Sequence, residues 1–157
     1  MEITFTPLDE STAREIVCWW YQPPYDIYNL DDSDDVIQYT LDPQNNFYAM
    51  RAEDGKLIGF CSFGKDGQVP GGDYGEQALD IGMGIRPDLT GQGRGSEFVA
   101  AALDFAHKEF SLERFRVTIA AFNQRAQRVW EKNGFKQTQT FTHTESKHDF
   151  VVMVNHA

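Results

Sequence analysis

Two stretches of this chain contain residues whose types and spacing could do chemistry. The first, residues 85–95, is a turn in which Gly91, Gly93 and Gly95 precede an apolar-periodic run that predicts a helix. The first amides of such a helix have no internal acceptor and lie at the positive end of its dipole, so they suit a phosphate or pyrophosphate. With Arg94 nearby as a candidate counter-charge, the expected occupant is anionic.

The residues before this turn predict a strand with one nearly bare face. In Leu79–Ile85, apolar residues alternate with Asp80, Gly82 and Gly84, which is the period of a β-strand. Pro87 has no N–H and ends the strand. A ligand could therefore lie against the backbone on the glycine face.

Two common nucleotide-binding motifs do not fit the turn. A Walker loop needs Gly-Lys-Ser/Thr, but Gly95 is followed directly by Ser96. A dinucleotide fingerprint needs glycine or alanine three residues after its second glycine, where this chain has Ser96 or Phe98. The anion is therefore not expected to be a nucleoside triphosphate or a dinucleotide.

The second stretch follows a further predicted strand, residues 115–122. Asn123 ends that strand before a short helix that carries Ala126 and Trp130, and Gly134 is placed to end the helix. Strand, helix, strand and helix thus follow one another in order.

Together the two stretches resemble the acyl-CoA core of the GNAT superfamily of N-acetyltransferases. The family's loop reads roughly Gln/Arg-x-x-Gly-x-Gly/Ala, and its second motif reads roughly Asn-x-x-Ala-x-x-x-Tyr-x-Lys-x-Gly-Phe. Both occur here in the right order, and the resemblance covers residues 79–135, with the flanks matched by element order alone. It implies acetyl-CoA as cosubstrate, with the acyl arm entering where strands 79–85 and 116–122 splay apart.

The resemblance also implies cofactor contacts at particular positions. The backbone of Met83, Gly84 and Ile85 would bind the pantetheine arm, with Asn123 beside it. Ala126 and Trp130 would line the thioester end. The diphosphate would be held by the amides of six consecutive residues: Gly91, Gln92, Gly93, Arg94, Gly95 and Ser96.

Two residues depart from the family pattern. Thr90 replaces the usual Gln or Arg, which leaves the phosphate-binding amides untouched. Trp130 replaces a tyrosine that can protonate the leaving thiolate, and an indole N–H is a donor but not a usable acid.

An acetyltransferase that acts on a primary amine is the leading hypothesis, and a non-catalytic acyl-CoA sensor or interaction module is the alternative. A third hypothesis keeps the fold and changes the acyl group, with Trp130 and Met83 shaping its pocket.

The catalytic centre is assigned to Asp80 and Trp130. An amine with a pKa near ~10.4 must lose a proton before it attacks, and Asp80, on the glycine face, is the first candidate base. The alternative is that Asp80 binds a neighbouring backbone group or arginine, and that Trp130 is an aromatic wall. Tyr25 and Tyr28 are expected to line the substrate pocket, with core packing as the alternative. No Gly-x-Ser-x-Gly signature occurs, so direct attack on the thioester is preferred.

Length and composition limit the class of protein that this chain can be. The 157 residues suit one domain, 1–157, with an α/β fold, a mixed sheet, about seven strands and about four helices. No apolar run approaches the ~20 residues of a membrane span, and no signal peptide is recognised, so a cytoplasmic protein without a membrane partner is expected. No metal-ligand spacing occurs, and Cys18 and Cys61 are expected to be buried thiols. Dimerisation through the last strands is compatible with the sequence, but no pattern establishes it.

The charges are unevenly distributed. A net charge of −10 argues against nucleic acid as a partner. Residues 1–85 carry 16 acidic and 4 basic residues, whereas residues 86–136 carry 6 acidic and 9 basic residues. The basic region would favour an anionic cofactor and the acidic region a cationic amine, small molecule or peptide; solubility is the alternative explanation of the acidic surface.

The remaining elements are predicted from periodicity and caps. Residues 11–21 predict a helix that begins at Asp9 or Ser11 and stops before Pro23-Pro24. Further predicted elements are a strand at 3–6, a helix at 36–41, a hairpin of 47–52 with 56–64, a loop at 65–77, and strands at 136–144 and 148–155.

Overall fold

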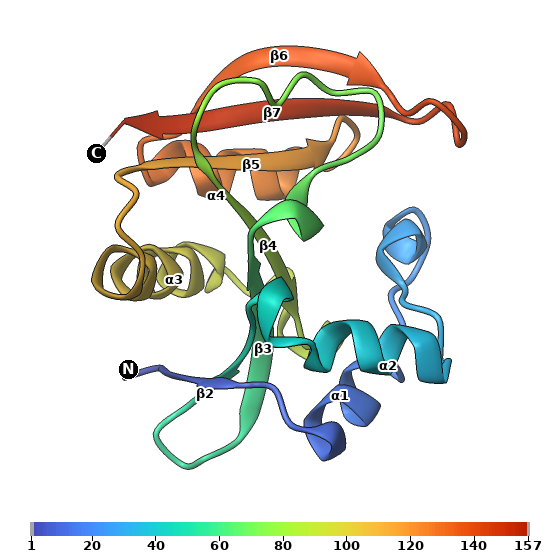
Figure 1. Ribbon diagram of the computed structural model, residues 1–157, viewed down its shortest axis with the longest axis vertical. Coiled ribbons are helices and arrows are strands. Elements are labelled where there is room, and N and C mark those ends of the chain that lie inside the picture. The colour runs from blue at the N-terminus through green and yellow to red at the C-terminus, as the bar shows by residue number, and fades with distance from the viewer. Residues whose placement is uncertain (1, 157) are drawn as a thin grey trace. The chain divides into compact units, whose positions relative to one another are not determined.

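The computed structural model describes residues 2–156, which contain seven strands and four α-helices (Figure 1). The strands are β1 (Thr4–Pro7), β2 (Phe47–Arg51), β3 (Leu57–Phe63), β4 (Leu79–Ile85), β5 (Arg114–Ala120), β6 (Lys136–Thr142) and β7 (Asp149–His156). The helices are α1 (Glu10–Ile16), α2 (Asp34–Leu41), α3 (Gly95–Glu109) and α4 (Gln124–Lys132). The mixed α/β prediction is confirmed.

The strands form one hydrogen-bonded sheet in the order β1-β2-β3-β4-β5-β7-β6. The pairing of β4 with β5 is parallel, and it joins only Leu79 to Phe115 and Asp80 to Arg116. Beyond that point β5 stays paired with β7 as far as Ala120, whereas β4 leaves the ladder. The parallel pairing of β4 with β5 therefore ends early, and the entry of an acyl arm beyond it, which the family resemblance implies, stays a prediction.

The chain divides into two compact units. Unit 1 comprises the residues up to Ser62 together with Met83–Thr90, and unit 2 comprises Phe63–Gly82 together with the residues from Gly91 onward. Strand β4 contributes its first half to unit 2 and its second half to unit 1. The prediction of a single domain over 1–157 stays a prediction.

In unit 1, α1 and α2 are capped as the sequence indicates. Oδ1 of Asp9 accepts from the Thr12 amide, and Oγ of Ser33 accepts from the Val36 amide. The core of unit 1 consists of Leu8, Ala13, Ile16, Val17, Ile37, Phe47, Ala49 and Leu57.

The predicted end of α1 was wrong, because the helix stops at Ile16, well before the two prolines. The Cys18 and Trp19 amides bond to carbonyls three residues earlier, which tightens the chain and ends the α-helical pattern. Cys18 is exposed, so only Cys61 is the buried thiol that was expected of both. Burial raises the pKa of the Cys61 thiol, which keeps it protonated.

In unit 2, helices and the β3–β4 loop cover opposite faces of the sheet. α3 buries Phe98, Val99, Ala102, Leu103 and Ala106. In β5 the Phe115 ring lies 4.7 Å from the His107 ring of α3, whereas Arg116 points to the loop. Figure 1 shows β5, β7 and β6 side by side with the green loop in front of them. Among the described residues, no helix is long and apolar enough to cross a membrane.

Candidate active site

The glycine turn enters α3 with a backbone that favours glycine. Gly91 and Gly93 have φ angles of 73° and 77°, in the left-handed region where a Cβ atom is unfavourable. A Cβ at Gly91 would lie 3.1 Å from Nη1 of Arg125, whereas a Cβ at Gly93 would meet no atom within 4 Å. The turn therefore passes beside the first turn of α4, and Gly93 lies at its open side.

The N-terminus of α3 keeps the features expected of an anion site. Its cap residue, Arg94, makes no side-chain capping hydrogen bond, so the side chain of the cap residue itself does not take up the first amides of the helix. Nε of Arg94 lies 3.5 Å from Glu97, and its guanidinium lies 5.1 Å from the centroid of the Phe98 ring. These contacts hold the positive charge of Arg94 at the first turn of the helix.

Within unit 2, residues of the second motif, at α4, contact residues of the glycine turn at the start of α3. Nδ2 of Asn133 donates to Oγ of Ser96 over 3.3 Å and to the Val129 carbonyl over 2.9 Å. A Cβ at Gly95 would lie 3.1 Å from Val129, so the lack of a side chain lets α3 start against α4. The structure thus brings the two predicted motifs together, joined by Asn133, which the sequence analysis did not single out.

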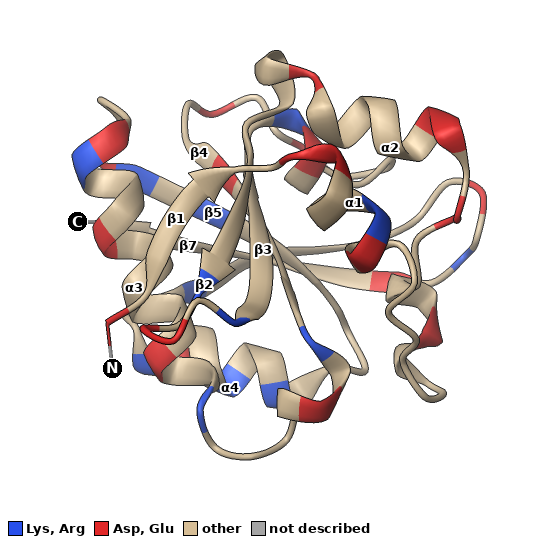
Figure 2. Cartoon of the chain, turned by 90° about the horizontal axis from the view of Figure 1, so that it is seen from below, with Lys and Arg blue, Asp and Glu red and all other residues tan. Residues whose placement is uncertain are grey.

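Helix α4 adds positive charge next to the turn. Arg125, Arg128 and Lys132 give it three basic residues, and Figure 2 shows blue segments along its length. Because the helix packs on α3, these charges favour an anion near the glycine turn. The residues present therefore fit a diphosphate group.

The other residues assigned to the cofactor on α4 have structural contacts. Asn123 is buried, and its Oδ1 accepts a hydrogen bond from the Ala126 amide, which caps the helix. Trp130 is 6% exposed and stands edge-on to Phe135, with ring centroids 4.9 Å apart. Trp130 is thus an apolar wall, and the contacts of Asn123, Ala126 and Trp130 with a cofactor stay predictions.

The end of β4, Met83–Ile85, belongs to unit 1, and its glycine face is covered. The Phe60 ring occupies the space that a Cβ at Gly84 would need, so a protein side chain lies against the backbone there. The Arg86 amide bonds to the Ile58 carbonyl of β3. Because strand amides alternate in direction, the backbone groups of Met83 and Ile85 point away from β3.

Tyr21, which the sequence analysis passed over, binds this strand end. Its hydroxyl donates to the Ile85 carbonyl over 2.7 Å, and its amide donates to Oδ1 of Asn29 over 2.7 Å. Burial raises the pKa of Tyr21 from 10.0 to about 12. One of the carbonyls predicted to bind pantetheine therefore already accepts a hydrogen bond from the protein.

The raised pKa of Tyr21 predicts a pH-dependent loss of stability. The folded state holds the phenol proton more tightly than the unfolded state, so this contribution is complete below pH 10 and is lost as pH rises through about 12. We expect the wild type to lose about 2 kcal/mol more unfolding free energy over that range than Tyr21→Phe does. Denaturant titrations at several pH values measure this difference, and parallel pH curves for the two proteins would contradict it.

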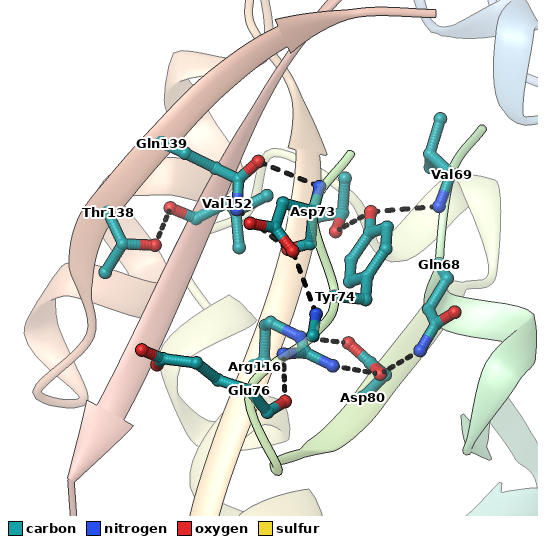
Figure 3. A network of polar contacts seen from close by, with 12 residues as sticks. Gln68, Val69, Asp73, Tyr74, Glu76, Asp80, Arg116, Thr138, Gln139 and Val152 are labelled. Atoms are coloured by element: carbon teal, nitrogen blue, oxygen red, sulfur yellow. Dashed lines mark hydrogen bonds and ion pairs between the residues drawn. The ribbon is translucent and has the colours of Figure 1, made fainter. Parts of the chain in front are cut away.

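Asp80 lies in a buried ion pair (Figure 3). Its Oδ1 accepts from Nε of Arg116 over 2.6 Å, and its Oδ2 accepts from Nη2 of Arg116 over 2.8 Å and from Nε2 of Gln68 over 2.9 Å. The pair raises the pKa of Arg116. This geometry matches the alternative that Asp80 binds an arginine. Both oxygens of the Asp80 carboxylate are thus engaged by N–H donors of the protein.

Tyr25 and Tyr28 lie in unit 1 at the two ends of a short 3₁₀ helix, Tyr25–Tyr28. Tyr28 is 36% exposed, and Ile27 between them is 37% exposed. Neither tyrosine is part of the core, so the core-packing alternative is not supported for them. Among residues 2–156, no group of three or more His, Cys, Asp or Glu side chains is placed to hold a metal ion.

Comparison with known proteins identifies the family. The model of the Acetyltransferase (GNAT) domain matches residues 3–136, so the chain belongs to the GNAT acetyltransferase family. No curated protein matches the sequence significantly.

Solved structures share the fold at low sequence identity. AAC(6')-Ib in complex with ribostamycin and coenzyme A is 19% identical, with a TM-score of 0.76 over 99% of this chain and 94% of the other. A GNAT-family acetyltransferase from Bacillus anthracis is 19% identical, with a TM-score of 0.72 over 97% and 93%. A spermidine N-acetyltransferase SpeG chimera from Vibrio cholerae and hSSAT is 17% identical, with a TM-score of 0.71 over 99% and 95%.

Proposed function

We propose that this protein transfers an acetyl group from acetyl-CoA to a primary amine. The observation that carries the proposal is the left-handed glycine turn at the start of α3, whose cap residue makes no side-chain capping hydrogen bond, in a chain of the GNAT family. The basic residues of α4 support it, because they lie beside that turn.

Each cofactor contact is assigned to residues whose surroundings allow it. The amides between Gly91 and Ser96 would hold the diphosphate, and the outward backbone groups of Met83 with the amide of Ile85 would bind the pantetheine arm, since the Ile85 carbonyl already accepts from Tyr21. Ala126 and Trp130 would line the thioester and exclude water from it. Bound acetyl-CoA supplies a thioester carbon that a neutral amine can attack directly.

The acceptor is proposed to be a cationic amine. Acidic residues far outnumber basic ones in the first 85 residues, and such a surface attracts cations. Relatives of the same fold include spermidine N-acetyltransferases and AAC(6')-Ib bound to ribostamycin, which is consistent with small polar acceptors. Tyr25 and Tyr28 would contact the acceptor from the acidic side of the chain.

Calorimetry and a thiol-release assay test the proposal. We expect coenzyme A to bind with a dissociation constant in the micromolar range, and acetyl-CoA to release free thiol at least about tenfold faster when a suitable amine is present. The assay screens polyamines, amino acids, peptides and aminoglycosides against a reaction without amine. Binding without thiol release for any amine would favour the sensor hypothesis that Trp130 raises, and no binding at high concentration would reject both.

A further inference from the structure

The parallel pairing of β4 with β5 is too short to define its own register. It joins two residue pairs, and parallel ladders are slightly less stable per residue than antiparallel ones. A slip by two residues keeps every side chain on its own face of the sheet, so hydrophobic patterning does not oppose it strongly. Some other interaction must therefore select the observed register.

The ion pair of Asp80 with Arg116 lies at the last paired position. These two residues are direct partners across the strands, and the fork of the guanidinium meets both carboxylate oxygens. Asp80 is 3% exposed and Arg116 is 5% exposed, so water cannot replace either partner. A two-residue slip would place Arg116 opposite Ala78 or Gly82, neither of which can pair with a buried cation.

The β3–β4 loop, residues 64–78, contacts Arg116 at this last paired position (Figure 3). The Tyr74 ring centroid lies 4.9 Å from Cζ of Arg116, and the Tyr74 hydroxyl lies 2.8 Å from Oγ1 of Thr118. Nη1 of Arg116 donates to the Glu76 carbonyl over 2.9 Å. The guanidinium is thus held by β4, by the loop and by an aromatic face.

The loop is in turn tied to the far strand of unit 2. The Asp73 amide donates to Oε1 of Gln139 over 3.1 Å, and Nε2 of Gln139 donates to the Asp73 carbonyl over 2.9 Å. Gln139 lies on β6, so the loop spans β5, β7 and β6. A loop anchored at both ends keeps Tyr74 over Arg116.

We propose that Asp80 and Arg116, held by Tyr74, form a positioning pair that fixes the register of β4 against β5 and so the point at which the two strands separate. The proposal rests on the proposed function in one respect, because the backbone of β4 beyond that point is where the pantetheine arm would bind. Asp80 then acts through Arg116 and not on the reacting atoms.

The test compares three proteins: the wild type, the double variant Asp80→Asn/Arg116→Met and Tyr74→Phe. The double variant removes both charges together and leaves no unpaired buried ion, so it should fold. Tyr74→Phe keeps the ring over Arg116 and removes the two hydroxyl contacts, with Oγ1 of Thr118 and with the Val69 amide. Cross-strand NOEs between β4 and β5 report the register, calorimetry reports coenzyme A affinity, and kinetics separate KM for acetyl-CoA from kcat.

We expect the double variant to lose or shift the NOEs between residues 79–80 and 115–116, and to bind coenzyme A at least about tenfold more weakly. KM for acetyl-CoA should rise by the same factor while kcat changes less than about threefold. For Tyr74→Phe, the coenzyme A affinity, KM and kcat should each stay within about threefold of the wild-type value. Unchanged NOEs, or a shifted register with unchanged affinity, would overturn the proposal.

The wild-type measurement separates this proposal from the proposed function. If the wild type itself does not bind coenzyme A, the proposed function fails, and the register role stands or falls on the NOEs of the double variant alone.

Discussion

Gly93→Asp is expected to weaken coenzyme A binding about 100-fold relative to Gly93→Asn. The two side chains have nearly the same size, and both residue types tolerate the left-handed backbone found at Gly93. A Cβ at this position meets no neighbouring atom, so neither substitution should disturb packing. They differ in one negative charge. About 5 Å from two phosphate charges, at an effective dielectric of roughly 40, that charge costs about 3 kcal/mol.

Calorimetry of the two variants and the wild type measures this effect. Gly93→Asn isolates the cost of the side chain and the backbone, which we expect to stay below about tenfold. Because Gly93 is exposed, added salt should shrink the difference between the Asp and Asn variants. Equal affinities of the two variants at low salt would place the diphosphate away from the glycine turn and remove the main support of the proposed function.

Local sequence signals predicted the elements around this turn well. β4 has the bounds that its alternation predicted, and Gly134, with a φ of 90°, follows α4 as a glycine cap should. Both depend on neighbouring residues only, since proline fixes its own φ angle and glycine permits the left-handed backbone whatever the rest of the chain does. The prediction of Asp9 as a cap of α1 also depended on neighbouring residues only.

The predictions that failed depended on distant contacts. The helix prediction continued to Tyr21 because Pro23-Pro24 was the next stop signal in the sequence, but the helix ends at Ile16 and the Tyr21 amide bonds to Asn29. Cys18 lies just past the end of α1 and is exposed. No local pattern reports a hydrogen bond between residues eight positions apart.

The residues of the candidate site also divide into those with a local sequence signal and those that depend on distant contacts. The glycine turn could be found because its chemistry is in consecutive amides, whereas Arg116 lies 36 residues from Asp80 and Tyr74 comes from a loop without periodicity. A charged residue inside an otherwise apolar predicted strand, as Arg116 is in β5, was the signal for a buried partner. Tyr21 offered no such signal, because an aromatic residue near a helix end is common in cores.

Breaking one side of the buried ion pair should cost more stability than removing both sides. Asp80→Asn leaves the guanidinium of Arg116 buried without a counter-charge. Arg116→Met likewise leaves the carboxylate of Asp80 buried without a counter-charge. Each single change is expected to lower the free energy of unfolding by about 3–5 kcal/mol, which is the usual cost of an uncompensated buried charge. The double variant should lose less than either single variant, because no unpaired ion remains inside.

Denaturant unfolding of the four proteins gives the coupling free energy directly. We expect it to exceed about 3 kcal/mol in favour of the pair, far above the ~0–1 kcal/mol of an exposed pair. The exposed pair of Lys108 with Asp104 on α3 is the matched control, and its cycle should give a coupling in that small range. Additive losses at Asp80 and Arg116 would mean that water reaches the two side chains. The register would then need another anchor, and the hydrogen bond between the Tyr74 hydroxyl and Thr118 of β5 is the next candidate for that role.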